Sequence, residues 1–128
     1  MRRVYVDQTL RKIRAGELLW PARQAWKYAA VKAGMALGRP LAGPILGTIF
    51  VTYRCNIRCE MCDLPAREGP ELSTDEWKRV VDDFAALGTS GIGYTGGEPL
   101  LRADTVDLLA YTKAKGVVTH LNTNGMLV

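Results

Sequence analysis

The sequence of 128 residues lacks a fourth cysteine, a second histidine and any long uninterrupted apolar run. Charged residues and prolines break every apolar stretch well short of the roughly 20 residues that a membrane-spanning helix needs. The same interruptions exclude a secretory signal. Three cysteines cannot all pair within one chain. These absences indicate a cytoplasmic protein, in which thiols stay reduced and clustered cysteines serve as metal ligands.

The excess of positive charge is confined to the N-terminal part of the chain. Residues 1–46 carry nine Lys or Arg against two acidic residues, a net charge of +7, whereas residues 47–128 carry eight against eleven, a net charge of −3. The larger part therefore lacks the basic surface that nucleic-acid binding requires. We expect no nucleic-acid partner, and we divide the chain into a basic helical extension with a linker, residues 1–46, and a domain, residues 47–128.

The extension contains one helical pattern. From Leu18 to Leu37 the apolar residues recur on a single stripe that includes Trp26, and Arg23 and Lys27 are turned away from it. This amphipathic helix suits either an anionic membrane surface or a position packed against the neighbouring domain. Four of the seven stripe residues are alanine, whereas membrane-surface helices carry bulkier apolar faces, so the pattern favours packing over membrane binding.

Residues 47–128 alternate between strand and helix patterns. The predicted strands are 48–53, 90–94 and 117–121, and the predicted helices are 73–87 and 103–115. Ser73 and Glu76 form a capping box at the start of the first helix. This order requires parallel strands joined by right-handed crossovers. Function in such sheets gathers at the carboxyl ends of the strands, so the segments that follow the three strands should converge.

Three thiols follow the first predicted strand: Cys55, Cys59 and Cys62. Thiolates are the natural ligands of iron–sulfur clusters and of zinc. A closed zinc site needs four ligands, and the single histidine, His120, lies inside the third predicted strand, where we interpret it as structural. Three ligands for a cluster of four irons would leave one iron open to a small molecule.

The C-x3-C-x2-C loop after the first strand, together with Gly96-Gly97-Glu98-Pro99 after the second, resembles the radical SAM superfamily. The resemblance implies an α/β fold, an incomplete parallel (β/α) partial barrel of the TIM-like type, preceded here by the N-terminal amphipathic helix. The family barrel has six strand–helix units, and the sequence stops where the third helix should begin. We therefore expect residues 47–128 to be the first half of a core domain, and the chain to be a fragment of a longer enzyme.

For the chemistry, the resemblance implies a 4Fe-4S cluster on Cys55, Cys59 and Cys62, with S-adenosylmethionine chelating the open iron. Reductive cleavage of this cofactor gives a 5′-deoxyadenosyl radical that abstracts hydrogen from a substrate which the sequence does not identify. An electron donor such as flavodoxin or ferredoxin is implied as a partner. No catalytic residue is expected beyond the cluster ligands.

The resemblance also assigns cofactor contacts. Gly96 and Gly97 would let the backbone approach the methionine moiety, and Glu98 would accept a hydrogen bond from its amino group. Met61 takes a position where the family often has an aromatic residue, and its side chain can pack beside the cofactor.

Three interpretations stay open at this point. Thr123 and Asn124 follow the third strand, and they lie either near the cofactor or in an ordinary turn. Arg54 and Arg58 either offset the charge of the cluster or are solvated. The alternative to a radical SAM enzyme is a non-catalytic iron–sulfur or zinc-binding module, so whether this chain alone is an enzyme is left open.

Overall fold

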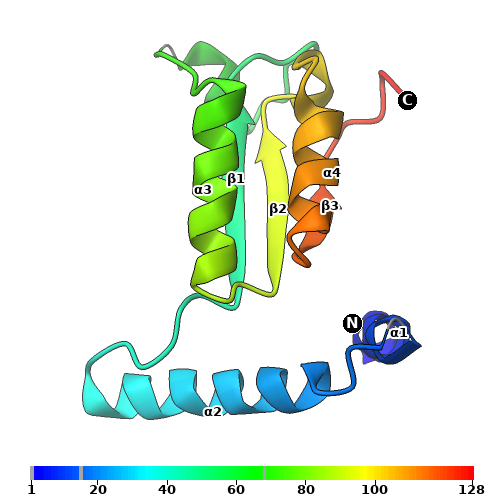
Figure 1. The fold of residues 1–128 in the computed structure, drawn as a ribbon. Coiled ribbons are helices and arrows are strands. Elements are labelled where there is room, and N and C mark those ends of the chain that lie inside the picture. The colour runs from blue at the N-terminus through cyan, green and yellow to red at the C-terminus, as the bar shows by residue number, and fades with distance from the viewer. Residues whose placement is uncertain (1, 15, 68) are drawn as a thin grey trace. The chain divides into compact units, whose positions relative to one another are not determined.

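The computed structural model describes residues 2–14, 16–67 and 69–128 (Figure 1). It contains two compact units, Met1–Gly43 and Pro44–Val128. The boundary between them lies close to the division at residue 46 that the charge pattern predicts. The second unit carries all three segments in which the sequence analysis expects the site.

The second unit is built on a parallel sheet of three strands. The strands are β1 (Leu46–Thr52), β2 (Gly91–Gly96) and β3 (Val118–Leu121), in the spatial order β1-β2-β3. Leu46 stands opposite Gly91, and Gly91 stands opposite Val118, so the strands start at a common level. The predicted parallel α/β order is confirmed, and the carboxyl ends of all three strands lie at the same edge of the sheet (Figure 1).

Two helices cover one face of this sheet, α3 (Thr74–Ala86) and α4 (Thr105–Ala114) (Figure 1). The predicted capping box begins α3: the Ser73 amide donates to Glu76 Oε2 at 2.8 Å, and the Glu76 amide donates to Ser73 Oγ at 3.4 Å. The buried apolar core lies between the helices and the sheet. Its residues are Ile49, Val51, Trp77, Val81, Ile92, Tyr94, Leu108 and Val117.

The opposite face of the sheet is open among the described residues. Leu46 and Phe50 alternate along β1 with the buried residues, and their exposed fractions are 58% and 49%. Within the described part of the chain, β1 and β3 each pair with β2 alone. A sheet with one bare face and two unpaired edges agrees with the predicted incomplete barrel.

The first unit contains two helices, α1 (Arg2–Arg14) and α2 (Trp20–Leu37). The helix predicted over residues 18–37 starts two residues before α2 and ends at the same residue, Leu37. Gly38 follows the helix with φ 65°, in the left-handed region. It did not predict α1, because five Lys or Arg in thirteen residues obscure the apolar period. None of the described helices is long and apolar enough to cross a membrane.

The facing of α2 differs from the sequence interpretation. Trp26, expected on the covered stripe, is 76% exposed, whereas Lys27, expected on the solvent side, is 9% exposed. Gly34 is also buried, and a Cβ there would lie 2.7 Å from the Arg39 carbonyl oxygen. The chain thus folds back across Gly34 after the helix ends, and the covered side of α2 is the side of Gly34 and Lys27. Packing of the apolar stripe through Trp26 against the second unit stays a prediction.

Candidate metal and cofactor site

The segments that follow the three strands meet at the carboxyl edge of the sheet. The Glu98 amide, after β2, donates to the Arg54 carbonyl oxygen after β1 at 2.8 Å. The side chain of Asn124, after β3, donates from Nδ2 to Asn56 Oδ1 at 2.8 Å. The predicted convergence of the cysteine loop with the other two segments is therefore confirmed.

The three cysteines are free thiols that line one cavity. Cys55 is half-buried, and Cys59 and Cys62 are exposed. The Cys62 amide donates to the Cys59 carbonyl oxygen at 3.1 Å, which forms a turn between the second and third thiols. The cavity has a volume of about 570 Å³. Its lining consists of Arg54, Cys55, Arg58, Cys59, Cys62, Pro65 and Ala66.

Zinc and a 4Fe-4S cluster place different demands on three thiolates. In a mononuclear zinc site all ligands lie about 2.3 Å from one ion and so crowd around one point. Among residues 2–14, 16–67 and 69–128, no three Cys, His, Asp or Glu side chains are grouped closely enough to hold a single metal ion. In a 4Fe-4S cluster each thiolate binds a different iron, so the thiols need to share a cavity and not a point. Three thiolates that share one cavity therefore fit a 4Fe-4S cluster.

The two glycines after β2 permit a close approach between backbones. The Gly97 amide donates to the Thr52 carbonyl oxygen at 2.9 Å. Gly96 has φ 139°, and a Cβ there would lie 2.2 Å from that same oxygen. A Cβ on Gly97 would lie 2.2 Å from the Arg54 carbonyl oxygen. Both positions thus require glycine for the packing of this segment on the end of β1, and their predicted contact with a cofactor stays a prediction.

Glu98 is fully buried, with an exposed fraction of 0%. Its Oε1 accepts hydrogen bonds from the Leu100 amide and from Thr123 Oγ1, both at 2.9 Å, and its Oε2 accepts one from the Asn124 amide at 2.8 Å. Burial raises the pKa of Glu98, but the hydrogen bonds from Asn124, Leu100 and Thr123 outweigh burial, so the net pKa lies below the ordinary value. The carboxylate is therefore ionised and holds the segment after β3 to the segment after β2.

The structure brings some of the remaining candidates to the site and leaves others outside. Thr123 and Asn124 lie at the site through Glu98 and Asn56, and Asn124 Nδ2 also lies 3.9 Å from Cys55 Sγ. Met61 is 97% exposed, so its contact with a cofactor stays a prediction. His120 is exposed within β3.

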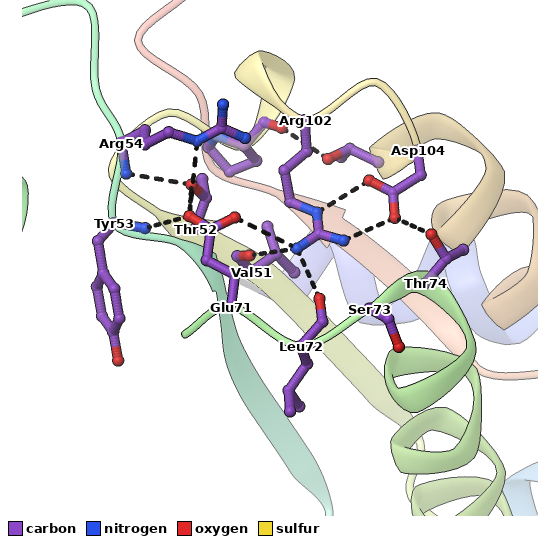
Figure 2. A network of polar contacts seen from close by, with 12 residues as sticks. Val51, Thr52, Tyr53, Arg54, Glu71, Leu72, Ser73, Thr74, Arg102 and Asp104 are labelled. Carbon is purple, nitrogen blue, oxygen red and sulfur yellow. Dashed lines mark hydrogen bonds and ion pairs between the residues drawn. The ribbon is translucent and has the colours of Figure 1, made fainter. Parts of the chain in front are cut away.

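A polar network beside the site was missed by the sequence analysis (Figure 2). Figure 2 shows the Arg102 guanidinium between the carboxylates of Glu71 and Asp104. Arg102 Nε and Nη2 donate to the two oxygens of Asp104 at 2.9 and 2.7 Å, and Arg102 Nη1 lies 3.5 Å from Glu71 Oε2. Thr74 Oγ1 at the start of α3 donates to Asp104 Oδ2 at 2.6 Å. The hydrogen bonds from Arg102, opposed by partial burial, lower the pKa of Asp104 to about 2.

Glu71 faces the end of β1. It accepts a hydrogen bond from Thr52 Oγ1 at 2.5 Å, and its Oε1 lies 3.6 Å from Arg54 Nε. Burial raises the pKa of Glu71, but the Thr52 hydrogen bond and the charges of Arg54 and Arg102 give a net lowering. The sequence left open whether Arg54 offsets the charge of a cluster or is solvated. In the structure Arg54 forms an ion pair with Glu71. The only sequence signal for this network was two oppositely charged residues, Arg102 and Asp104, between the Gly-Gly-Glu-Pro segment and α4.

Comparison with known proteins adds a family match. The model of the radical SAM superfamily matches residues 49–128. The PqqA peptide cyclase of Rhodopseudomonas palustris is 41% identical over 81 residues, which cover 61% of this chain and 22% of that protein. The PqqA peptide cyclase of Bradyrhizobium diazoefficiens is 38% identical over 81 residues, with 61% and 21% covered. The chain thus spans about a fifth of the length of these curated relatives.

Solved structures show the same fold. Streptococcus suis SuiB bound to S-adenosylmethionine matches with a TM-score of 0.64 and 21% identity, over 99% of this chain and 30% of that one. SuiB bound to its precursor peptide SuiA matches with a TM-score of 0.64 and 20% identity, over 98% and 33%. At this level of identity the likeness is one of fold.

Proposed function

Because the chain belongs to the radical SAM superfamily, whose members use a 4Fe-4S cluster and S-adenosylmethionine, we propose that Cys55, Cys59 and Cys62 hold that cluster. The observation that carries the proposal is the single cavity lined by all three thiols at the carboxyl end of β1. When bound, the reduced cluster supplies an electron for cleavage of S-adenosylmethionine, and the resulting 5′-deoxyadenosyl radical abstracts hydrogen from substrate.

The chain's own residues orient and enclose this chemistry. Glu98 fixes the segment after β3 against the segment after β2 through Thr123 and Asn124. Gly96 and Gly97 keep the second segment close to the end of β1, so that all three loops present their backbone to one place. We assign binding of S-adenosylmethionine to this place, next to the thiols, with Gly96 and Gly97 as contact residues and Met61 at its margin. Glu98, expected from the sequence to accept a hydrogen bond from the cofactor, is fully buried, and we assign it the role of holding Thr123 and Asn124 at this place.

For the whole protein we propose a peptide as the substrate. The support is that both curated relatives are named as peptide cyclases, and that one solved neighbour is bound to a precursor peptide. The radical would abstract hydrogen from a side chain or backbone carbon of that peptide. We place the reaction in the cytoplasm, where the three thiols stay reduced and an electron donor such as flavodoxin or ferredoxin is at hand.

Anaerobic reconstitution with iron and sulfide tests the cluster assignment on the 128-residue chain. We expect about four irons per chain and a broad visible absorbance, as a three-thiolate 4Fe-4S centre requires. A variant with all three cysteines replaced by alanine should lose both. His120→Ala is the matched control, since it removes the single histidine, and it should bind iron as the wild type does. Stoichiometric zinc binding without iron uptake would refute the assignment and favour the zinc-binding module.

A further inference from the structure

The three cysteines lie on a long loop that has little regular structure of its own. The loop leaves β1 after Thr52 and reaches the cap of α3 at Ser73. Among its described residues, regular structure is limited to one 3-10 turn, η1 (Leu64–Ala66). A loop of about 20 residues does not by itself fix the position of its side chains. The Glu98 amide on the Arg54 carbonyl oxygen and the Asn124 side chain on Asn56 hold the start of the loop from outside. Contacts between the two ends of the loop act beside these in determining how the first thiol, Cys55, enters the cavity.

Glu71 joins the last part of this loop to its first part. Besides the hydrogen bond from Thr52 Oγ1, its Oε1 accepts one from the Tyr53 amide at 3.4 Å. Thr52 Oγ1 in turn accepts a hydrogen bond from the Arg54 amide at 3.1 Å. One carboxylate near the end of the loop therefore organises the backbone of the two residues that precede Cys55.

Arg102 joins the same two ends a second time. Its Nη1 donates to the Val51 carbonyl oxygen at 3.1 Å and to the Leu72 carbonyl oxygen at 2.9 Å (Figure 2). The Arg102 side chain is only 8% exposed, and its paired hydrogen bonds to Asp104 fix the plane of the guanidinium. Arg102 thus holds β1 beside the end of the loop, and Glu71 lies 3.5 Å from it.

We propose that Glu71 is a positioning residue for the cluster ligands, which ties the two ends of the loop together with Arg102 and so sets the orientation in which Cys55 enters the cavity. The inference rests on the proposed function, because it takes the cysteines to be the cluster ligands. The contacts of Glu71 are with residues before Cys55, and it acts through Thr52, Tyr53 and Arg54.

This role is separable from a role in general stability. The core residues Val51 of β1 and Trp77 and Val81 of α3 already bring the two ends of the loop near each other through packing. Loss of the Glu71 carboxylate therefore leaves the core in place and frees mainly the backbone around Tyr53 and Arg54. A purely structural residue would instead lower the stability of the whole unit.

Hydrogen exchange on the chain without a cluster tests whether Glu71 fixes the backbone at Tyr53 and Arg54. The variants are Glu71→Ala and Glu71→Gln, and the control is Asp83→Asn, which alters an exposed carboxylate on α3. We expect the Tyr53 and Arg54 amides of Glu71→Ala to exchange about fivefold faster, as for loss of a typical intramolecular hydrogen bond. Amides in the middle of α3 and α4 should keep their wild-type rates. In Glu71→Gln, which keeps the side-chain length and one acceptor oxygen, the exchange rates of the Tyr53 and Arg54 amides should lie between those of the wild type and those of Glu71→Ala.

Reconstitution with iron and sulfide then tests the consequence for the ligands. We expect Glu71→Ala to bind less iron per chain than the wild type and to give an altered electron paramagnetic resonance spectrum after reduction, with Glu71→Gln closer to the wild type. Asp83→Asn should match the wild type in both measurements.

The two proposals fail in different ways. If the wild type takes up no iron, the proposed function is wrong, and exchange at Tyr53 and Arg54 still decides whether Glu71 fixes the start of the loop. Unchanged exchange at these amides in Glu71→Ala would show that Glu71 does not fix the start of the loop, which overturns the proposal. A wild-type iron content and spectrum in Glu71→Ala would overturn its positioning role. Faster exchange throughout α3 and α4 would assign Glu71 to general stability, which also overturns it.

Discussion

Asn124 connects two of the three converging loops through one side-chain amide. Its Nδ2 donates to Asn56 Oδ1 at 2.8 Å and lies 3.9 Å from Cys55 Sγ. An amide donor beside a cluster sulfur stabilises the more negative, reduced state and so raises the reduction potential. Because Asn124 is supplied by the segment after β3, we expect that segment to influence the potential of a cluster bound through Cys55 in the loop after β1.

Replacing this amide should lower the potential of the reconstituted cluster. We expect Asn124→Ala to shift the midpoint potential downward by about 20–40 mV, which corresponds to a hydrogen bond of about 0.5–1 kcal/mol for a one-electron couple. Redox titration followed by electron paramagnetic resonance measures it. Asn122→Ala is the control, because Asn122 lies in the same segment and its hydrogen bond to the Tyr94 carbonyl is made by the backbone. An equal shift in both variants would contradict a specific effect of Asn124.

At the scale of residues, the sequence predicts the site where the chemistry itself requires a residue type at a fixed spacing. Cys55, Cys59 and Cys62 follow such a spacing, and the structure puts them on one cavity. Glu71 and Arg102 follow none, since their contact joins residues about 30 positions apart through ordinary charges. Many surface charges look the same in a sequence, so only the folded chain distinguishes this pair.

At the scale of elements, Asp104 links the start of α3 to the segment before α4. It accepts hydrogen bonds from Thr74 Oγ1 and from two nitrogens of Arg102, and its pKa is lowered to about 2 from an ordinary 3.8. A carboxyl group whose pKa is lower in the folded state stabilises that state above its unfolded pKa and loses this contribution as the pH falls toward the folded pKa. The stabilisation is therefore complete at pH 5 and is lost between about pH 4 and pH 2.

Asp104→Asn should remove this pH dependence. We expect the difference in unfolding free energy between the wild type and the variant to shrink by about 2 kcal/mol as the pH is lowered from 5 toward 2. Urea unfolding followed by circular dichroism at several pH values measures it. Asp75→Asn serves as a control, because the Asp75 side chain is 87% exposed and lies 3.9 Å from Lys78. A constant difference for Asp104→Asn across this range would contradict the assignment.

The elements themselves show how far sequence patterns reach. Helix α3 was predicted within about one residue at each end, because a capping box fixes its start through local contacts. The side of α2 that is covered within its own unit was not predicted, because the stripe of small apolar residues indicates a helix but does not decide which side is covered. That choice depends on Gly34, where the chain after the helix crosses the helix backbone. Such a contact depends on the path of the chain and leaves no periodic signal.

At the scale of the whole molecule, the two units differ in charge and in content. Residues 1–43 form α1 and α2 and carry most of the positive charge, whereas residues 44–128 contain the sheet, the complete apolar core and the cavity with the three thiols. All eight core residues lie between positions 49 and 117. We therefore expect the cluster site to depend on the second unit alone.

Deletion of residues 1–43 tests this division. The deletion removes none of the core residues named above and none of the residues that line the cavity with the three thiols. The circular dichroism spectrum of the shortened chain should therefore still show helix and strand, with the helical signal reduced only by the loss of α1 and α2. The shortened chain should also bind as much iron per chain as the full 128 residues. A second deletion that ends at residue 17 removes α1 and keeps α2, so it assigns any loss to one helix. The shortened chain carrying the Cys55, Cys59 and Cys62 to alanine replacements gives the background. If the deletion of residues 1–43 abolishes iron uptake while the deletion of 1–17 does not, α2 is required by the site and the two units do not act independently.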